Sequence, residues 1–301
     1  MKLNRYHGAA ISAFLIWGFI PFPLKALTDF PASQILYFRI LVSVLTLLAI
    51  SLTTRRQQWQ ETLQLFKGQA PKERKRFVLF TFLGGVLLTV NWLAFIYVVN
   101  HVDIQTGSFS YLLCPILTAF LGYLLLREQL RLNQWISIGL SLMSCLLVGT
   151  DSLYNLLFSL LIAASYAFYL ITQRLMKDYD KIVLLTLQLL LAFLFIGPSY
   201  PWFVGDSAQP ITVHFAGQIV LLSWVFTVLP LFLNLYALKE LKSATVGVLM
   251  YLNPIINFTM AFLYFGEVAS QQKIVAYFVI FLSVILYNLP IGKKKEAEAS
   301  I

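Results

Sequence analysis

The chain has 301 residues, of which 59% are hydrophobic and 12% are charged, and its mean hydropathy is +0.78. These values lie outside the range of soluble domains and indicate an integral membrane protein. A bilayer-spanning helix takes about 20 mainly apolar residues, so the chain has length for roughly ten such helices and for no soluble catalytic domain. Its two cysteines, Cys114 and Cys145, lie in apolar runs and are expected to pack as small core side chains.

Apolar runs separated by polar breaks predict ten transmembrane helices. Their predicted ranges are 7–27, 33–53, 77–99, 104–126, 132–150, 153–173, 182–203, 215–238, 243–265 and 271–290. The runs are continuously apolar rather than alternating at every second residue, so the predicted fold class is all-α. The first run follows two basic residues, as in a signal peptide, but no small-x-small cleavage pattern comes after it, so a retained helix is expected.

The basic residues predict the orientation of the chain. With the N-terminus inside, 19 of the 22 Lys and Arg residues fall on inner segments, and Lys273 is the one basic residue of the predicted outer loops. Cytoplasmic loops of membrane proteins are enriched in Lys and Arg, so both termini are expected in the cytoplasm, most simply at a bacterial inner membrane. The same bias explains the net charge of +9 without a nucleic-acid partner. The run Lys72 to Arg76, in a predicted basic loop 54–76, is assigned at most a weak role at anionic lipid headgroups.

The two halves of the chain repeat each other at two offsets. Pairs at an offset of 139 residues are Tyr97 and Tyr236, Pro115 and Pro254, and Glu128 and Glu267. Pairs at an offset of 149 residues are Trp17 and Tyr166, Lys25 and Arg174, and Arg39 and Gln188. The difference of ten residues matches the excess of loop 54–76 over its counterpart near 204–214, so one gap explains both offsets.

Five helices in each unit is an odd number, so the second unit must enter the membrane in the opposite sense. We therefore predict inverted five-helix repeats at 1–151 and 152–292, followed by a cytoplasmic tail at 293–301. Such repeats are related by an axis in the membrane plane. A substrate site is expected near the midplane, in a central cavity that opens to either side in turn.

Ionisable residues within spans are the first candidates for function, because charge in hydrocarbon is costly. Arg39 lies about six residues into the second span and shares a helical face with Ser43 and Thr46. Its guanidinium is suited to a carboxylate or phosphate; the alternative is a structural arginine that holds backbone carbonyls or snorkels outward. Lys25 is the weaker candidate, because it lies near a helix end where snorkelling is expected.

Prolines and polar side chains supply further candidates. Pro21, Pro115 and Pro254 are expected to kink their helices and act in gating. Side chains that could bind substrate or join helices are Trp17, Asn91, Trp92, Tyr111, Tyr166, Gln173, Gln188, Asn234, Asn253 and Asn257. Close helix packing is expected at Gly84, Gly85, Gly107 and Gly139. Glu128 and Glu267 are expected to cap or pair at equivalent helix ends rather than to carry protons.

Motifs for other chemistry are missing from the sequence. It has no glycine-rich phosphate loop and no HExxH, and its three histidines lie near span ends. We therefore expect no metal, no cofactor, no catalytic residue and no enzymatic activity.

The residues that carry a family resemblance run from Gly8 to Glu267. They are Gly8-Ala9-Ala10, Trp17-Gly18, Pro21, Lys25, Phe38-Arg39, Asn91-Trp92, Tyr111 to Pro115, Glu128, Tyr251-Leu252-Asn253-Pro254 and Glu267. With these the chain resembles the drug/metabolite transporter superfamily, and within it the EamA-type ten-helix carriers of the RarD kind. One departure is Cys114, where that branch usually has asparagine before the proline, so a substrate cannot be taken over from relatives.

The resemblance implies a carrier that exports or exchanges a small polar or amphipathic metabolite. In this hypothesis Arg39 binds an anionic group of an amino acid or related solute, aromatic side chains pack its apolar part, and amides complete its hydrogen bonds. The partners are then one small-molecule substrate and the lipid bilayer, and the unit works as a monomer or weak dimer. A lipid scramblase, a nonenzymatic membrane partner and a membrane-embedded enzyme remain alternatives. The energy source stays open.

Overall fold

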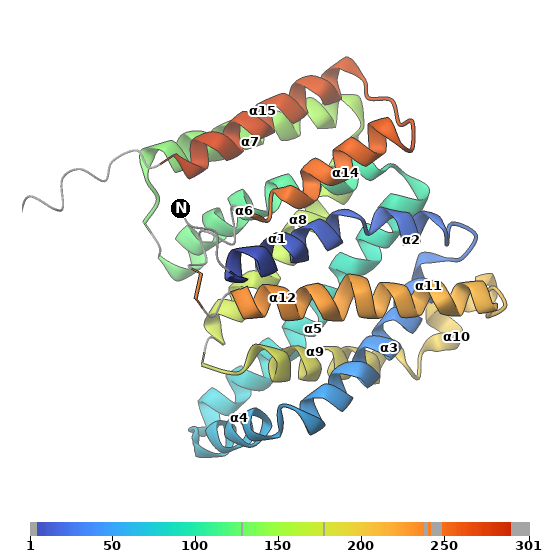
Figure 1. Ribbon diagram of the computed structural model, residues 1–301. Coiled ribbons are helices and arrows are strands. Elements are labelled where there is room, and N and C mark those ends of the chain that lie inside the picture. The colour runs from blue at the N-terminus through green and yellow to red at the C-terminus, as the bar shows by residue number, and fades with distance from the viewer. Residues whose placement is uncertain (1–4, 128, 177, 238–239, 242–248, 290–301) are drawn as a thin grey trace, which may run out of the picture.

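The structure, a computed structural model, describes residues 5–127, 129–176, 178–237, 240–241 and 249–289. This part of the chain is helical and contains no strand, as the sequence predicts (Figure 1). Its elements in chain order are α1 (Arg5–Gly18), α2 (Pro21–Lys25), α3 (Ala32–Thr53), α4 (Arg56–Gly68), α5 (Pro71–His101), α6 (Ile104–Leu126), α7 (Leu132–Asp151), α8 (Leu153–Leu175), α9 (Lys181–Ile196), α10 (Tyr200–Phe203), η1 (Gly205–Ser207), α11 (Val213–Ser223), η2 (Trp224–Val228), α12 (Leu229–Ala237), α14 (Leu252–Leu263) and α15 (Gln271–Asn288).

Eight helical segments of the described chain are long and apolar enough to cross a membrane, and they match eight of the ten predicted spans. The other two predicted spans differ. The span at 182–203 is divided, because Pro198 has no N–H to continue α9, which ends at Ile196. The span at 243–265 begins outside the described residues, and α14 covers its second half.

The prediction of a basic loop at 54–76 is wrong, because most of this segment is helical. Residues Arg56–Gly68 form α4, in which Trp59, Leu63 and Phe66 recur at the spacing of one helical face. Pro71 then starts α5 at the first helical position, where a missing N–H costs no hydrogen bond. The 31-residue α5 therefore begins well before the apolar run that the sequence marks as a span.

Helices α7 and α15 lie side by side along one edge of the molecule (Figure 1). Ser144 Oγ donates to the carbonyl of Ala276 at 2.7 Å, and Ser283 Oγ donates to the carbonyl of Ser137 at 2.8 Å. Both residues of the first bond are 139 positions from their counterparts in the second. The two helices thus exchange equivalent serine hydrogen bonds at the predicted offset.

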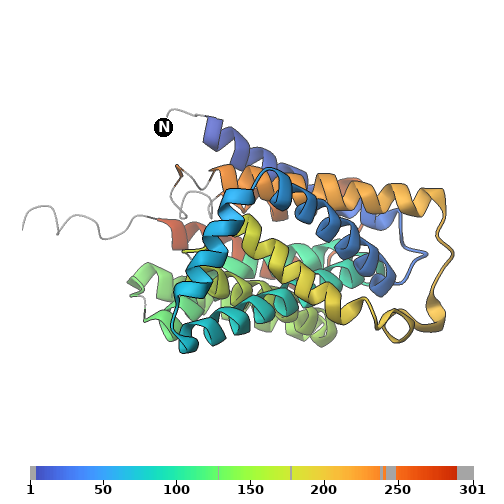
Figure 2. The ribbon, with the colours of Figure 1, turned by 90° about the horizontal axis from the view of Figure 1, so that it is seen from below.

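The edge that Figure 2 views contains α3, α4 and α9. Here α9 crosses α5 so closely that a Cβ on Gly85 would lie 2.5 Å from the carbonyl oxygen of Gln188. Gly84 and Gly107 also face close neighbours, as predicted for packing glycines. Gly139 was expected in this group and does not belong to it, because nothing lies within 4 Å of its added Cβ.

A polar cluster ties the end of α6 that begins at Ile104 to the segment before α15. Glu267 accepts hydrogen bonds from the backbone N–H groups of Ile104 and Gln105 at 2.8 and 3.2 Å, which is the expected capping role. Burial raises the pKa of the Glu267 carboxyl, and these two donors oppose that rise. Its predicted partner in the repeat, Glu128, lies outside the described residues.

Lys273 Nζ reaches Asp103 Oδ2 in the same cluster at 3.0 Å, and both side chains are largely buried, with exposed fractions of 11% and 18%. The one basic residue of the predicted outer loops is therefore neutralised by an ion pair. Asp103 also caps α6 by accepting from the Thr106 N–H at 2.5 Å.

We expect Gly85→Ala to lower the melting temperature of the purified protein, because the obstructing atom belongs to the backbone of α9 and cannot rotate away. Overpacking of this kind costs about 1–3 kcal/mol. Gly139→Ala is the matched control, since its Cβ meets open space in the middle of a helix. Equal melting temperatures for the two variants would contradict the close α5–α9 crossing.

We expect Lys273→Met to destabilise the protein by about 1.5–3 kcal/mol, because it leaves the largely buried Asp103 carboxylate without its charged partner. The double variant Asp103→Asn with Lys273→Met is expected to recover part of this loss, since asparagine still caps α6. Thermal melts of the two variants in detergent check this. A double variant that melts below the single one would show that the ion pair is not the cause.

Candidate functional site

A central cavity of about 80 Å³ lies between helices from both halves of the chain. The residues that line it are Phe14, Trp17, Ile20, Arg39, Leu88, Trp92, Phe95, Tyr111, Tyr166, Tyr169, Phe226, Thr227, Leu231, Met250 and Asn253. Most are aromatic or aliphatic, and a few polar groups converge among them, which is typical of small-molecule sites. Because such sites ordinarily measure ~300–1,000 Å³, a solute larger than a few atoms requires side chains to move.

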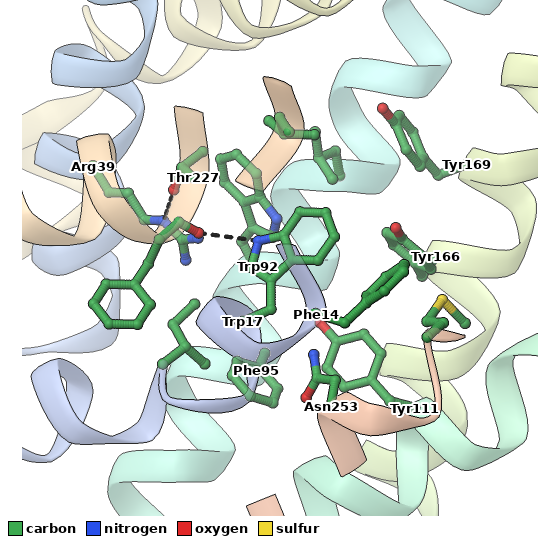
Figure 3. Close-up of a pocket in the computed structure, with 15 residues that line it drawn as sticks. Phe14, Trp17, Arg39, Trp92, Phe95, Tyr111, Tyr166, Tyr169, Thr227 and Asn253 are labelled. Carbon is green, nitrogen blue, oxygen red and sulfur yellow. Dashed lines mark hydrogen bonds between the residues drawn. The ribbon is translucent and has the colours of Figure 1, made fainter. Parts of the chain in front are cut away.

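Arg39 is the cationic side chain of the cavity lining, and it is 3% exposed. Its Nε donates to Thr227 Oγ1 at 3.0 Å, and its guanidinium carbon lies 4.4 Å from the centre of the Trp92 ring (Figure 3). The ring face and the hydroxyl partly replace water around the charge. Within the described part of the chain, no carboxylate forms an ion pair with Arg39. The cation is thus left in a position to receive an anion from outside the protein.

The partner of Arg39 belongs to an unusual turn of helix. Residues Trp224–Val228 form η2, a π-helical turn between α11 and α12, and such turns are frequent at functional sites. Thr227 Oγ1 donates to the carbonyl of Leu222 at 2.9 Å while it accepts from Arg39. The hydroxyl is therefore fixed from both sides, and it orients the guanidinium.

Pro230 helps to explain the hydrogen bond that Trp17 makes at this turn. Proline has no N–H, so the carbonyl four residues earlier, that of Phe226, lacks its usual helical donor. Trp17 Nε1 donates to this carbonyl at 3.1 Å (Figure 3). An indole from α1 thus satisfies a buried acceptor of η2 and places its own ring in the cavity wall.

The opposite wall is a series of tyrosines on α6 and α8 (Figure 3). Ring centres are 6.1 Å apart for Tyr111 and Tyr166 and 5.7 Å apart for Tyr166 and Tyr169. Phe95 packs against Tyr111 at 5.3 Å. This wall presents ring faces and edges to any solute whose anionic end reaches Arg39.

The structure brings six of the twelve candidate substrate-binding residues to the cavity and places the other six elsewhere. The six that line it are Trp17, Arg39, Trp92, Tyr111, Tyr166 and Asn253. Asn91 is buried behind Tyr111, accepts from its hydroxyl at 3.4 Å and donates to the Ile162 carbonyl at 2.8 Å. It therefore supports the wall and joins α5 to α8.

The remaining five candidates, Lys25, Gln173, Gln188, Asn234 and Asn257, do not line the cavity. Lys25 ends α2, where its positive charge favours the ionised carboxyl of Glu267 and so opposes the rise of that pKa. Gln188 accepts from Gln173 at 3.0 Å beside the α5–α9 crossing, and Asn257 donates to Asn253 at 2.9 Å. Asn234 is half-buried, and its Oδ1 has no partner in the described part of the chain. These residues reach a solute only through their neighbours or after a conformational change.

The three predicted kink prolines occupy different positions in their helices. Pro115 lies inside α6, as predicted. Pro21 is the first residue of α2, and Pro254 is the third residue of α14. The last two therefore follow breaks between helices instead of bending continuous ones, because the first turn of a helix has no intrahelical acceptor for its N–H groups.

The sequence analysis missed Thr227 and Tyr169, which the structure places in the cavity lining. A signal for Thr227 was present, namely a hydroxyl three residues before Pro230 in the apolar run 224–233. Tyr169 is three residues after Tyr166 and so lies on the same helical face. In the described residues no group of three His, Cys, Asp or Glu side chains is placed to hold a metal.

Comparisons with known proteins concern the fold and the family of the chain. A chain of known crystal structure superposes with a TM-score of 0.61 over 95% of this chain and 98% of that one; at 14% identity this likeness concerns the fold alone. Protein RarD of Salmonella typhimurium is 30% identical over 285 residues, and Protein RarD of Salmonella typhi is 29% identical over 286, each match covering 92% of both chains.

A third relative, Uncharacterized transporter YojE of Bacillus subtilis, is 27% identical over 292 residues, which is 96% of this chain and 95% of its own. Residues 5–150 and 153–289 each match the EamA-like transporter family. These two matches cover nearly the whole chain and fall on its two halves. The protein is thus a multi-pass membrane protein that belongs to the EamA-like transporter family.

Proposed function

We propose that the protein is a secondary transporter of a small organic anion or zwitterion, such as an amino acid with an apolar part, and that it works as an exporter or exchanger. The observation that carries this proposal is the buried guanidinium of Arg39, which faces an aromatic cavity and forms no ion pair with a described carboxylate. A solute carboxylate would supply the missing charge with two parallel hydrogen bonds. The aromatic wall would hold its apolar part.

The mechanism we propose is alternating access between inverted repeats of five helices each, at 1–151 and 152–292. The cavity lining supports it, because ten of its residues form five pairs at the two sequence offsets. The pairs are Trp17 and Tyr166, Ile20 and Tyr169, Leu88 and Thr227, Trp92 and Leu231, and Tyr111 and Met250. Equivalent positions of both halves thus surround one central space.

Three direct packings support the same pseudo-two-fold relation. Each unites helices at corresponding places in the halves, namely α3 with α9, α6 with α14, and α7 with α15. The reciprocal serine bonds between α7 and α15 follow the same offset. Rocking of one half against the other would then open the cavity to each side in turn, with Pro21, Pro115 and Pro254 as points where helices break or bend.

The full proposal includes ten membrane crossings, both termini in the cytoplasm and a working monomer or weak dimer in the bacterial inner membrane. The distribution of basic residues supports this orientation, and its one exception, Lys273, is paired with Asp103. Asn91 is proposed to hold Tyr111 in place. Lys25, Gln188, Asn234 and Asn257 are proposed to act in states other than the one described.

We expect Arg39→Ala to reduce saturable solute uptake about tenfold or more, because a solute carboxylate then meets no buried cation; tenfold corresponds to ~1.4 kcal/mol of binding free energy. Counterflow into proteoliposomes measures this: vesicles are loaded with a mixture of unlabelled amino acids and related metabolites, and entry of labelled members is followed. Asn91→Ala is expected to weaken apparent affinity less, since it acts through Tyr111.

Two controls make the counterflow result interpretable. Arg39→Lys keeps the charge without the planar fork and is expected to fall between wild type and Arg39→Ala. Arg56→Gln removes an exposed charge of α4 and should leave uptake unchanged. Unchanged flux and affinity in both Arg39→Ala and Asn91→Ala would refute the site. Lipid movement in the same vesicles without saturable solute entry would favour a scramblase instead.

We expect Thr227→Val to raise the KM of the substrate found by counterflow about threefold to tenfold, because the loss of one hydrogen bond lets the Arg39 guanidinium leave its position. Thr227→Ser keeps the hydroxyl and should restore KM to near the wild-type value. The maximal rate should change little in either variant. If Val and Ser variants behave alike, the hydroxyl does not orient Arg39.

A further inference from the structure

A second hollow lies away from the central cavity, at the corner where α4 meets α5. It is an open groove of about 470 Å³ lined by Phe66, Arg74, Lys75, Val78, Leu79 and Phe82. None of these residues lines the central cavity. We call this set the corner groove.

The corner groove has an apolar floor and a basic rim because of the periodicity of α5. Residues 74, 75, 78, 79 and 82 recur at helical spacing and so lie on one face. Val78 and Leu79 are 52% and 58% exposed, which is expected of side chains that face lipid tails. Phe66 of α4 supplies a further wall, and its ring centre lies 5.3 Å from that of Phe77.

Arg74, one of the two basic residues of the rim, is held in place by hydrogen bonds to the end of α4. Its Nε donates to the carbonyl of Gln69 at 2.9 Å, and its Nη2 donates to the carbonyl of Lys67 at 2.6 Å. These bonds satisfy acceptors at the end of α4 and fix the guanidinium beside the groove without neutralising it. The rim therefore presents a positioned charge rather than a freely moving one.

The surrounding charge is strongly positive. Residues 55–76 contain seven Lys and Arg side chains and two Glu side chains. Two of the seven are paired, Arg55 with Asp180 at 3.6 Å and Arg76 with Glu73 at 3.8 Å. An anion that approaches the rim thus meets a local excess of cations beyond Arg74 and Lys75.

The length of α5 sets the depth of the corner groove. A helix of 31 residues measures about 46 Å at 1.5 Å per residue, which exceeds the ~30 Å hydrocarbon core. From this length and from the polarity of its first turns, we expect the beginning of α5 at the level of the headgroups and its apolar residues from Phe77 onward in the hydrocarbon. Arg74 and Lys75 are then expected at phosphate depth, and Val78, Leu79 and Phe82 at acyl-chain depth.

We propose that the corner groove is a binding site for one anionic phospholipid. Its phosphate binds between Arg74 and Lys75, and its acyl chains lie on Val78, Leu79 and Phe82 beside Phe66. Charge complementarity at the rim and apolar surface at the floor match the two parts of this amphipathic ligand. The site is separate from the proposed transport cavity, and its test requires no transported substrate.

The test measures lipid retained by the full-length protein in detergent, by native mass spectrometry. Dioleoyl phosphatidylglycerol and dioleoyl phosphatidylcholine are offered at equal concentration, so that the acyl chains are the same and the headgroup charge differs. We expect retention of phosphatidylglycerol to exceed that of phosphatidylcholine at least threefold. Lys75→Gln and Leu79→Asn should each reduce this preference or the total retention by a similar factor.

Matched controls distinguish binding in the corner groove from nonspecific attraction of anionic lipid to the basic surface. Arg56→Gln removes a charge from the other end of α4 and should retain the lipid as wild type does. Arg74→Gln also loosens the end of α4, so its result counts only with a wild-type melting temperature, and Lys75→Gln carries the test.

Millimolar glycerol 3-phosphate should fail to displace the lipid, because a headgroup alone lacks the apolar contacts. Equal retention of both lipids, or wild-type retention by both Lys75→Gln and Leu79→Asn, would overturn the proposal.

Discussion

A guanidinium inside a membrane protein must be compensated, and the centre of this structure is built around that requirement. Arg39 is buried within α3, a helix long and apolar enough to cross a membrane, and an unpaired charge in such a segment is costly. The protein places the Trp92 ring at 4.4 Å and the Thr227 hydroxyl at 3.0 Å from it. Compensation by a ring face and a neutral hydroxyl is incomplete, unlike that of a buried ion pair. Because the positive charge is only partly compensated, an anion that enters the cavity would be attracted to Arg39.

The backbone around η2 shows how one proline can determine a contact between helices. Pro230 deprives the Phe226 carbonyl of its helical donor, and the π-helical turn brings Thr227 into the cavity lining. Trp17 supplies the missing donor from another helix. In hydrocarbon such a carbonyl needs a partner within the protein, so the irregular turn and the indole depend on each other. The irregularity also joins α1 to the helix that orients Arg39.

The two halves of the chain contribute equivalent positions to the cavity, but the side chains at these positions differ. Equivalent positions from both halves line the cavity, yet Arg39 corresponds to Gln188, which lies at the α5–α9 crossing. Thr227 corresponds to Leu88. Equivalent helix positions in two inverted repeats would allow equivalent motions of both halves. Because the side chains differ, the lining has its cationic group on one side. The cationic side chain of the lining and its two neighbours, Trp92 and Thr227, come from α3, α5 and η2.

The sequence by itself determined the helical class, most of the spans, the repeat offsets and the family, because each depends on local apolar runs or on spacing along the chain. It also selected six residues that line the cavity, since a charged, aromatic or amide side chain inside an apolar run is visible without a structure. The helical nature of segment 54–76 was missed, because its polarity hid the amphipathic spacing of α4.

Only the tertiary structure decided which polar residues share one space. Gln188 and Asn257 have the same sequence signal as Tyr111, yet helix crossing turns them toward packing contacts and turns Tyr111 toward the cavity. Lys273 is an exception to the charge bias in the sequence and an ion-pair partner of Asp103 in the fold. The physical reason is that burial and pairing depend on how helices distant in sequence cross, and spacing within one helix does not contain that information.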